Sequence, residues 1–270
     1  MRLWICLHCA IMAVCYPTKK NGTEFEPEGK IVGGRPVSLR QFPSACLFFN
    51  LGAQCAGTIL NSWTILTAAH CFDKNKDDHQ MLIEVESRYL YDFYAKSHDV
   101  RKFVIHEDYN KAAKFACDIA LIFLADKIQF SSKAKKGVIV SHNKWMKENE
   151  KFIATGWGLT SYSGEVSDKG LLMAELRYIS SEDCGRMHKL NLTPDMFCLY
   201  GDGVKDTCKG DSGGGVIWNG MIVGITSHGA GCARINKPSV YANVWYFREW
   251  IKNHVQNYMD WYCEEKGKRT

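Results

Sequence analysis

Three separate stretches of the chain contain residue types that can act together in nucleophilic catalysis. The stretch KDTCKGDSGGG, residues 205–215, places Ser212 directly after an aspartate and before three consecutive glycines. Glycine clusters most often mark turns, so a simple turn is one interpretation. A serine becomes a good nucleophile only when a base takes its proton, and a histidine oriented by a carboxylate is a suitable base. Upstream, His70 in LTAAHC and Asp118 in CDIALIFL are candidates for these two roles.

The elements around these residues are predicted to be strands. Between Ile31 and Tyr241 short apolar runs, alternating or rich in β-formers, are separated by polar turns, which indicates an all-β chain. Asp118 precedes a very apolar run, where a carboxylate is costly unless it is paired. One helix is predicted near the end, from an apolar stripe at three- and four-residue intervals: Val244, Phe247, Trp250, Ile251 and Val255.

Length and charge limit the class of protein. The chain has 270 residues, 46% of them hydrophobic, and can bury the core of one large β domain or two small ones. The formal net charge of +5 is spread along the sequence, without the aromatic-interleaved basic stripe of a nucleic-acid-binding protein. We therefore expect no nucleic-acid partner.

The N-terminus has the pattern of a secretory signal. Arg2 precedes an apolar run from Leu3 to Val14, and Ala13 and Cys15 suit a cleavage site, so we predict a signal peptide over residues 1–15. A buried core helix is the alternative, but the run lies at the very start and ends in polar residues. No later run is long enough to cross a membrane. We expect a secreted, extracellular protein without a membrane partner.

Five motifs in order resemble the trypsin and chymotrypsin family of serine endopeptidases. They are IVGG at 31–34, TAAHC at 67–71, DIAL at 118–121, TGWG at 155–158 and GDSGG at 210–214. The resemblance runs from Ile31 to the terminal helix. It implies two antiparallel six-stranded β-barrels with a C-terminal helix, a protease domain over 31–256 split near 130–150, and a C-terminal tail over 257–270.

The resemblance also implies a role for each residue of the site. Ser212 would be the nucleophile, His70 the general base and then acid, and Asp118 the carboxylate that fixes the tautomer of His70. The backbone N–H groups of Gly210 and Ser212 would form the oxyanion hole. Glycine at 210 suits a backbone donor that must approach the developing oxyanion closely.

Activation follows from the same resemblance. Cleavage of the Lys30–Ile31 bond would free an ammonium group on Ile31 that pairs with Asp211. Residues 16–30 would then be an activation pro-segment of an inactive precursor, cut by an activating protease. The alternative, a solvated entry to the first strand, accounts for the lysine but not for Asp211.

The substrate pocket is similar to that of trypsin-like members, with two departures. Asp206 stands where such members carry the carboxylate that binds a substrate Arg or Lys, beside Thr207. The backbone of Ser227 and Gly229 would pair with an extended substrate. His228 replaces a large aromatic residue, and Ser239 replaces a pocket-lining glycine, so the pocket would be narrower. Phe115 would line the adjacent subsite, and Lys209 would lie at the rim or simply face solvent.

Three disulfides are implied by the family, and three cysteines remain. The implied pairs are Cys55–Cys71, Cys184–Cys198 and Cys208–Cys232. We expect a Cys117–Cys263 bridge and a buried thiol at Cys46. Two glycosylation sequons begin at Asn21 and Asn191.

The sequence therefore predicts a secreted serine endopeptidase zymogen that cleaves after Arg or Lys. The alternatives are a protease with altered specificity, owing to Ser239 and His228, and a non-catalytic binding homologue, which the intact set of His70, Asp118 and Ser212 argues against. Expected partners are protein or peptide substrates, the activating protease and protein protease inhibitors, and we expect a monomer. No cofactor or metal is predicted, since Glu84 and Glu86 fit a calcium loop poorly. We also expect no cysteine-rich module before Ile31 that could localise the protein.

Overall fold

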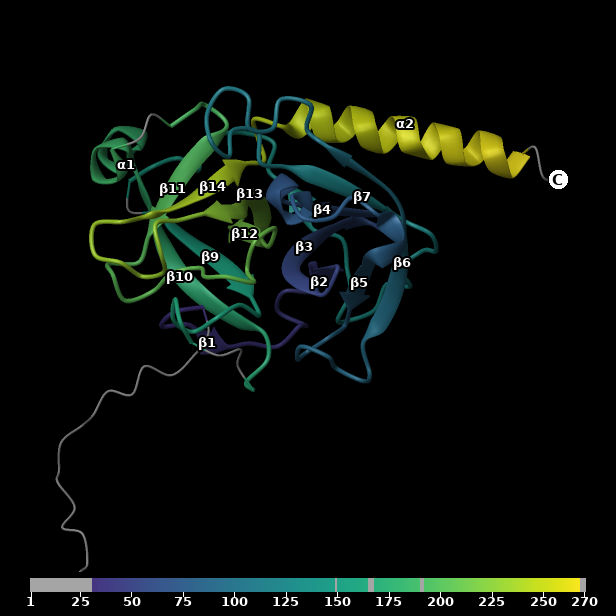
Figure 1. Cartoon of the computed structure of the whole chain (residues 1–270), viewed down its shortest axis with the longest axis horizontal. Helices are drawn as coiled ribbons and strands as arrows, with labels where there is room; N and C mark the ends of the chain where they lie inside the picture. Colours follow the sequence, from purple (N-terminus) through teal and green to yellow (C-terminus); the bar gives the residue numbers. More distant parts are fainter. Residues whose placement is uncertain (1–30, 149, 165–167, 190–191, 268–270) are drawn as a thin grey trace, which may run out of the picture.

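The chain folds into two β-barrels packed side by side, as the computed structural model shows (Figure 1). The structure describes residues 31–148, 150–164, 168–189 and 192–267. The predicted signal peptide, the pro-segment with Lys30, and Asn191 lie outside these residues. The prediction of an all-β fold with two six-stranded antiparallel barrels and a C-terminal helix is confirmed.

The first barrel is a closed ring of six antiparallel strands in the order β2-β3-β4-β7-β6-β5. Two short 3-10 helices, η1 (Ala69–Phe72) and η2 (Asp78–Gln80), follow β4. The strands are β2 (Ala45–Asn50), β3 (Ala53–Asn61), β4 (Thr64–Thr67), β5 (Met81–Val85), β6 (Lys96–Ile105) and β7 (Ala120–Leu124).

The second barrel is also a closed ring, in the order β9-β10-β11-β14-β13-β12, with β12 pairing back to β9. Two further strands attach to it: β1 (Arg35–Pro36) pairs with β10, and β8 (Val138–Ile139) runs parallel to β13. The ring strands are β9 (Lys151–Gly156), β10 (Leu172–Ile179), β11 (Met196–Tyr200), β12 (Gly215–Trp218), β13 (Met221–His228) and β14 (Ser239–Asn243).

A short helix that sequence analysis did not predict, α1 (Ser181–His188), connects β10 to β11. The Ser180 side chain caps it by accepting a hydrogen bond from the backbone N–H of Asp183 at 3.1 Å. The helix ends at Lys189, which has a left-handed backbone with φ of 56°. Only Cys184 of this helix is buried, so the sequence carries no apolar stripe that would reveal it.

Burial along the strands follows their position in the fold. In β5 buried and partly buried residues alternate, as expected for a strand with one face toward a barrel interior. In β7 all five residues are buried, because Ala120, Ile122 and Leu124 face the barrel core while Leu121 and Phe123 face the second barrel and the terminal helix. The apolar cluster between the barrels fixes their relative position.

The terminal helix, α2 (Arg248–Gly267), is longer than the sequence analysis predicted. It runs from the junction of the barrels across the first barrel (Figure 1). Tyr258 stacks on Phe123 with ring centroids 4.0 Å apart, and Tyr262 lies 4.7 Å from the ring of Trp63. The segment expected to be a tail from residue 257 is therefore helical through Gly267 and anchored to the first barrel by aromatic contacts.

The cysteine predictions are confirmed in part. The three implied disulfides are present, and Cys46 is a buried free thiol. The predicted Cys117–Cys263 bridge is wrong, because both cysteines are free. Continuation of α2 carries Cys263 along the helix to an exposed position, away from the barrel junction where Cys117 adjoins Asp118.

Candidate active site

The three candidate catalytic residues come from chain segments that meet where the barrels join. His70 lies in η1 directly after β4, and Asp118 lies two residues before β7, both in the first barrel. Ser212 lies three residues before β12 of the second barrel. The carbonyl oxygen of Ser212 accepts a hydrogen bond from Ala56 N–H at 2.7 Å and lies 3.9 Å from Sγ of Cys71, the neighbour of His70. Docking of the barrels thus brings the three segments together.

Asp118 is buried and accepts hydrogen bonds from both barrels. Its Oδ2 lies 2.8 Å from His70 Nδ1 and accepts from Ser227 Oγ at 2.5 Å, while Oδ1 accepts from the His70 backbone N–H at 2.9 Å. Burial opposes the charged carboxylate, but the adjacent imidazole and these donors lower the pKa of Asp118 below its ordinary value. Asp118 is therefore an ionised acceptor that fixes the His70 ring.

The electrostatics of His70 follow from this partner. Burial alone would lower its pKa, but the charge of Asp118, the hydrogen bond to it and the charge of Asp73 raise the pKa of His70 above 6.5. With Nδ1 bonded to Asp118, the proton of the neutral ring lies on Nδ1. The other ring nitrogen, Nε2, is then free to accept a proton.

Backbone conformation around Ser212 requires glycine at two positions. Gly210 has φ of 96° and Gly213 has φ of 83°, in the region that side chains rarely adopt. A Cβ on Gly213 would lie 2.1 Å from Oγ1 of Thr67 and 2.3 Å from the carbonyl oxygen of Ala56. Glycine directly after Ser212 is therefore required by close packing of the Ser212 loop against the first barrel.

A pocket of about 240 Å³ lies beside Ser212. Five of the predicted substrate-binding residues, Thr207, Ser227, His228, Gly229 and Ser239, line it together with Ser212. The Cys208–Cys232 disulfide joins two segments of its wall. Lys209 lies at the rim, with its Nζ 4.0 Å from the ring centre of Tyr162. Tyr162 is a lining residue that the sequence analysis missed, because no motif marks its loop.

Asp206, the sixth predicted substrate-binding residue, lies behind the lining of this pocket. It is 4% exposed and accepts hydrogen bonds from the backbone N–H groups of Thr207 at 2.8 Å and Ala233 at 2.9 Å, and from the Ser239 side chain. Burial raises its pKa to about 6 in spite of these donors. A Cβ on Gly229 would lie 2.8 Å from Ser239 Oγ, so the hydroxyl narrows the passage toward Asp206.

Asp211 is fully buried next to this pocket. It accepts hydrogen bonds from the backbone N–H groups of Gly158 at 2.8 Å and Cys208 at 2.9 Å. Burial is the main cause that raises its pKa to about 7, and none of the ion pairs among the described residues includes it. Asp211 is therefore a buried carboxyl group whose charged form a cationic partner would stabilise.

The segment that follows Lys30 is seated against the pocket loop. Ile31 is fully buried in the core of the second barrel, and the carbonyl oxygen of Val32 accepts from Asp206 N–H at 3.1 Å. Ile31 has φ of 55°, an unfavourable backbone conformation for a β-branched residue. The first residues after the predicted cleavage point thus contact the loop that carries Asp206.

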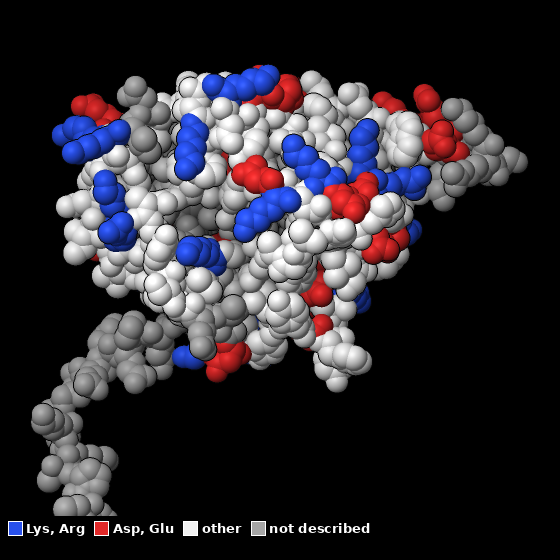
Figure 2. Space-filling view, in the orientation of Figure 1, with Lys and Arg blue, Asp and Glu red and all other residues white. Residues whose placement is uncertain are grey.

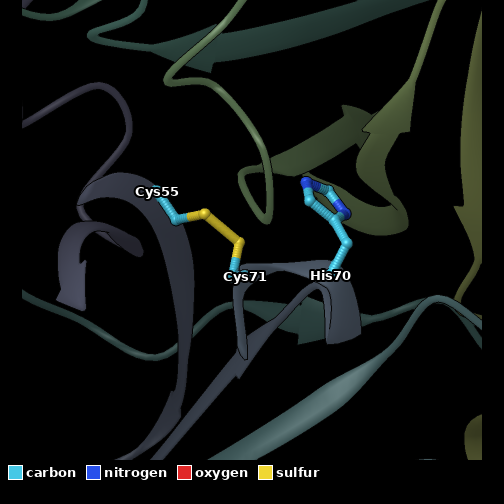
Figure 3. A group of neighbouring side chains, drawn as sticks. All are labelled: Cys55, His70 and Cys71. Atoms are coloured by element: carbon cyan, nitrogen blue, oxygen red, sulfur yellow. A yellow bond between two sulfur atoms is a disulfide. The ribbon is translucent and has the colours of Figure 1, made fainter. Parts of the chain in front are cut away.

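His70 also lies near two cysteines, in a group that resembles a metal-ligand set. Ligand atoms of Cys55, His70 and Cys71 lie within 4.8 Å of one another. The two sulfur atoms are bonded to each other as a disulfide (Figure 3). A disulfide does not offer the thiolates that bind a metal, so the residues present do not fit a metal site.

The surface and the helices give two further findings. On the face shown in Figure 2, acidic side chains lie among the groups of Lys and Arg, which do not form a continuous basic stripe. Among the described residues, no helix combines the length and apolar character needed to cross a membrane.

The two barrels, with an ionised aspartate oriented toward a histidine and a serine beside an adjacent pocket, define the fold and site of a chymotrypsin-like serine endopeptidase. The sequence profile of the Trypsin family matches residues 31–251. This chain belongs to that family and is a serine endopeptidase.

Comparison with individual proteins agrees with this assignment. The chain is similar to Trypsin epsilon of Drosophila erecta, with 33% identity over 91% of this chain and 94% of that protein. It is similar to Trypsin of Phaedon cochleariae, with 29% identity over 93% of this chain and 98% of that protein. It is also 32% identical to Transmembrane protease serine 11A of Homo sapiens over 73% of this chain, and the match spans only 48% of that relative.

Proposed function

We propose that this protein is a secreted protease zymogen that, once cleaved after Lys30, hydrolyses peptide bonds after Lys and, more slowly, after Arg. The observation that carries the proposal is the pocket beside Ser212, with the buried carboxylate of Asp206 behind its wall. A substrate cation is the natural partner of such a carboxylate. Three disulfides are typical of a protein that matures in an oxidising compartment, which supports secretion.

In the proposed mechanism Ser212 Oγ attacks the substrate carbonyl while His70 Nε2 takes its proton. The imidazolium that forms is stabilised by Asp118, which lies 2.8 Å from Nδ1. The backbone N–H groups of Gly210 and Ser212 stabilise the oxyanion of the tetrahedral intermediate. His70 then donates the proton to the leaving amine, and water repeats the sequence on the acyl-enzyme.

The preference for Lys over Arg rests on the position of Ser239. Its hydroxyl lies between the pocket and Asp206, so a substrate cation meets it before the carboxylate. A Lys ammonium is compact and can bond to a hydroxyl oxygen that itself donates to Asp206. The guanidinium of Arg is planar and wider, and its two-pronged bond to a carboxylate requires direct contact.

Activation is proposed to work through Asp211. Cleavage of the Lys30–Ile31 bond frees an ammonium that pairs with this buried carboxylate. The raised pKa of Asp211 supports the proposal, because an ammonium partner would offset the burial of its charge. Removal of the peptide bond before Ile31 also releases the backbone restraint at its positive φ.

A labelling experiment tests the function as a whole. The full chain and its Ser212→Ala variant are cleaved after Lys30, and both are treated with a fluorophosphonate probe that reacts with activated serines. We expect labelling only of the cleaved wild type. The absence of label on correctly cleaved wild type would instead favour a binding homologue. A peptide library then gives the residue preference, and equal cleavage after apolar residues would refute the proposed role of Asp206.

A further inference from the structure

His228 stands in the wall of the cleft beside the pocket, and its side chain extends the hydrogen-bonded chain of the active site. Its Nδ1 lies 3.0 Å from Ser227 Oγ, which in turn lies 2.5 Å from Asp118 Oδ2. Asp118 contacts His70. Four side chains therefore form a continuous series from His70 through Asp118 and Ser227 to His228.

The direction of each hydrogen bond in this series is fixed by the number of protons. Ionised Asp118 can only accept, so the single proton of the Ser227 hydroxyl is donated to it. Ser227 Oγ must then accept from His228, which places the proton of the His228 ring on Nδ1. In the neutral ring, Nε2 is left as a hydrogen-bond acceptor.

The position of Nε2 makes this acceptor available to a ligand. Nε2 forms no hydrogen bond with any of the described residues. A buried atom without a partner would count among the buried unpaired polar atoms, and Nε2 is not one of these, so Nε2 is accessible. The opposite nitrogen points toward buried Ser227, and His228 lines the pocket. Burial lowers the pKa of His228 to about 4, so the ring is neutral at neutral pH.

The rings around His228 hold it in this orientation. Phe115 stacks on it with centroids 4.5 Å apart and 20° between planes, and the same Phe115 ring meets the edge of His70 at 5.7 Å. A flip of the ring about its Cβ–Cγ bond would replace Nδ1 by a carbon beside Ser227 and so break the hydrogen bond, and it would interrupt the stacking on Phe115. The acceptor is thus preorganised rather than adaptable.

We propose that His228 Nε2 is a specificity-determining acceptor, which selects substrates with a hydrogen-bond donor on a side chain two to four residues before the cleaved bond. The donors that fit are a hydroxyl, an amide or an ammonium group. The inference rests on the endopeptidase activity and on substrate pairing with Ser227 and Gly229. It does not depend on whether Lys or Arg is cleaved.

The test uses pairs of peptides that differ only in Thr against Val, which have the same shape, at each of these three positions. All peptides carry, directly before the cleaved bond, the residue after which a peptide library is cleaved best. The result is therefore independent of whether the enzyme prefers Lys at that position. At one position, wild type should cleave the Thr peptide roughly three- to ten-fold better in kcat/KM, the contribution of one neutral hydrogen bond. His228→Phe keeps the stacked ring and should reduce that ratio to about one.

The matched control is His188→Phe, a histidine close enough to influence the charge of His228 but with its Nε2 bonded to the Pro238 carbonyl. This variant should keep the Thr preference. A wild-type ratio of one at all three positions, or a ratio that survives in His228→Phe, would overturn the proposal.

A second measurement requires no substrate cleavage, by the wild type or by a His228 variant. Nitrogen-15 NMR of labelled histidines in the activated Ser212→Ala enzyme at pH 7 should show His228 neutral with its proton on Nδ1. The resonances are assigned by their loss in the double variant with His228→Phe. A proton on Nε2 would contradict the inference directly, because that nitrogen would then be a donor.

Discussion

Replacing Ser239 by glycine should convert this pocket to one that accepts Arg well. Ser239 is buried, its hydroxyl bonds to Asp206, and the space between it and Gly229 is narrow. In Ser239→Gly both the hydroxyl and its Cβ are removed. A guanidinium could then reach Asp206 and form two hydrogen bonds with the carboxylate.

The size of the effect follows from the bonds exchanged. The hydroxyl removed contributes one hydrogen bond to a charged group, about 1.5–3 kcal/mol. In the variant, Arg forms two direct hydrogen bonds with Asp206: one replaces the lost hydroxyl bond, and the other is additional. We therefore expect the transition state for Arg substrates to be stabilised by about 1.5 kcal/mol, roughly ten-fold in kcat/KM. Lys peptides should change less than about three-fold, because in the proposed binding mode an ammonium already bonds to the hydroxyl in the parent enzyme.

The assay compares kcat/KM for two peptides that differ only in Arg or Lys at the cleaved residue, with active sites titrated by a serine-reactive probe. Ser239→Ala is the matched control, because it removes the hydroxyl but keeps the Cβ, and it should give a smaller gain for Arg. An unchanged or lower ratio of Arg to Lys cleavage in an active Ser239→Gly enzyme would refute the argument that Ser239 limits access to Asp206.

Three further predictions concern other parts of the molecule. In Asp118→Asn the two main causes that raise the pKa of His70, the charge of Asp118 and the hydrogen bond to it, are lost, and only the charge of Asp73 remains. The acid limb of the pH profile should therefore move to lower pH while the rate falls about 10⁴-fold; an unmoved limb would exclude His70 as the titrating base. In the uncleaved chain, the folded state holds the proton of Asp211 more tightly than the unfolded state, so this group reduces stability as pH rises from 3.8 toward about 7. Uncleaved Asp211→Asn should lack that loss in denaturant titrations across this range, and parallel curves for the two proteins would contradict the burial argument. Tyr258 is 5% exposed and stacks on Phe123, so Tyr258→Ala should lower the free energy of unfolding by about 3–5 kcal/mol. Tyr258→Phe should be neutral or stabilising, because the buried hydroxyl has no partner among the described residues. A loss of stability in both variants would show that the hydroxyl does form a hydrogen bond.

The fold and the principal site could be predicted because they depend on short local motifs. Each motif adjoins a strand in the structure: GDSGG ends directly before β12, TAAHC begins at the last residue of β4, and DIAL runs into the start of β7. The apolar runs between the motifs are barrel strands. Helix α1 could not be predicted in this way. Its cap residue Ser180 is recognisable, but the helix lies on the surface and has almost no apolar face.

The wrong prediction of a Cys117–Cys263 bridge has a different cause, the length of the terminal helix. The apolar stripe of the terminal helix does continue, through Tyr258 and Tyr262, but the family resemblance placed the end of the domain near residue 256. The aromatic partners of these tyrosines, Phe123 and Trp63, belong to the first barrel and are distant in sequence. Only the folded arrangement shows that the extension packs on the first barrel and that Cys263 is carried away from Cys117.

The contact between Ser227 and Asp118 also lies beyond sequence analysis, and it explains how the site depends on the pairing of the barrels. A buried carboxylate is costly in either barrel alone. Asp118 receives two hydrogen bonds from His70 of its own barrel and the third from Ser227 of the other. The ionised state of Asp118 therefore favours the docked barrels, the same arrangement that places Ser212 near His70. His228 follows Ser227 on β13 and is hydrogen-bonded to it. Ser227 donates to Asp118, and Asp118 orients His70. A substrate that contacts His228 therefore touches a residue connected to His70 through Ser227 and Asp118.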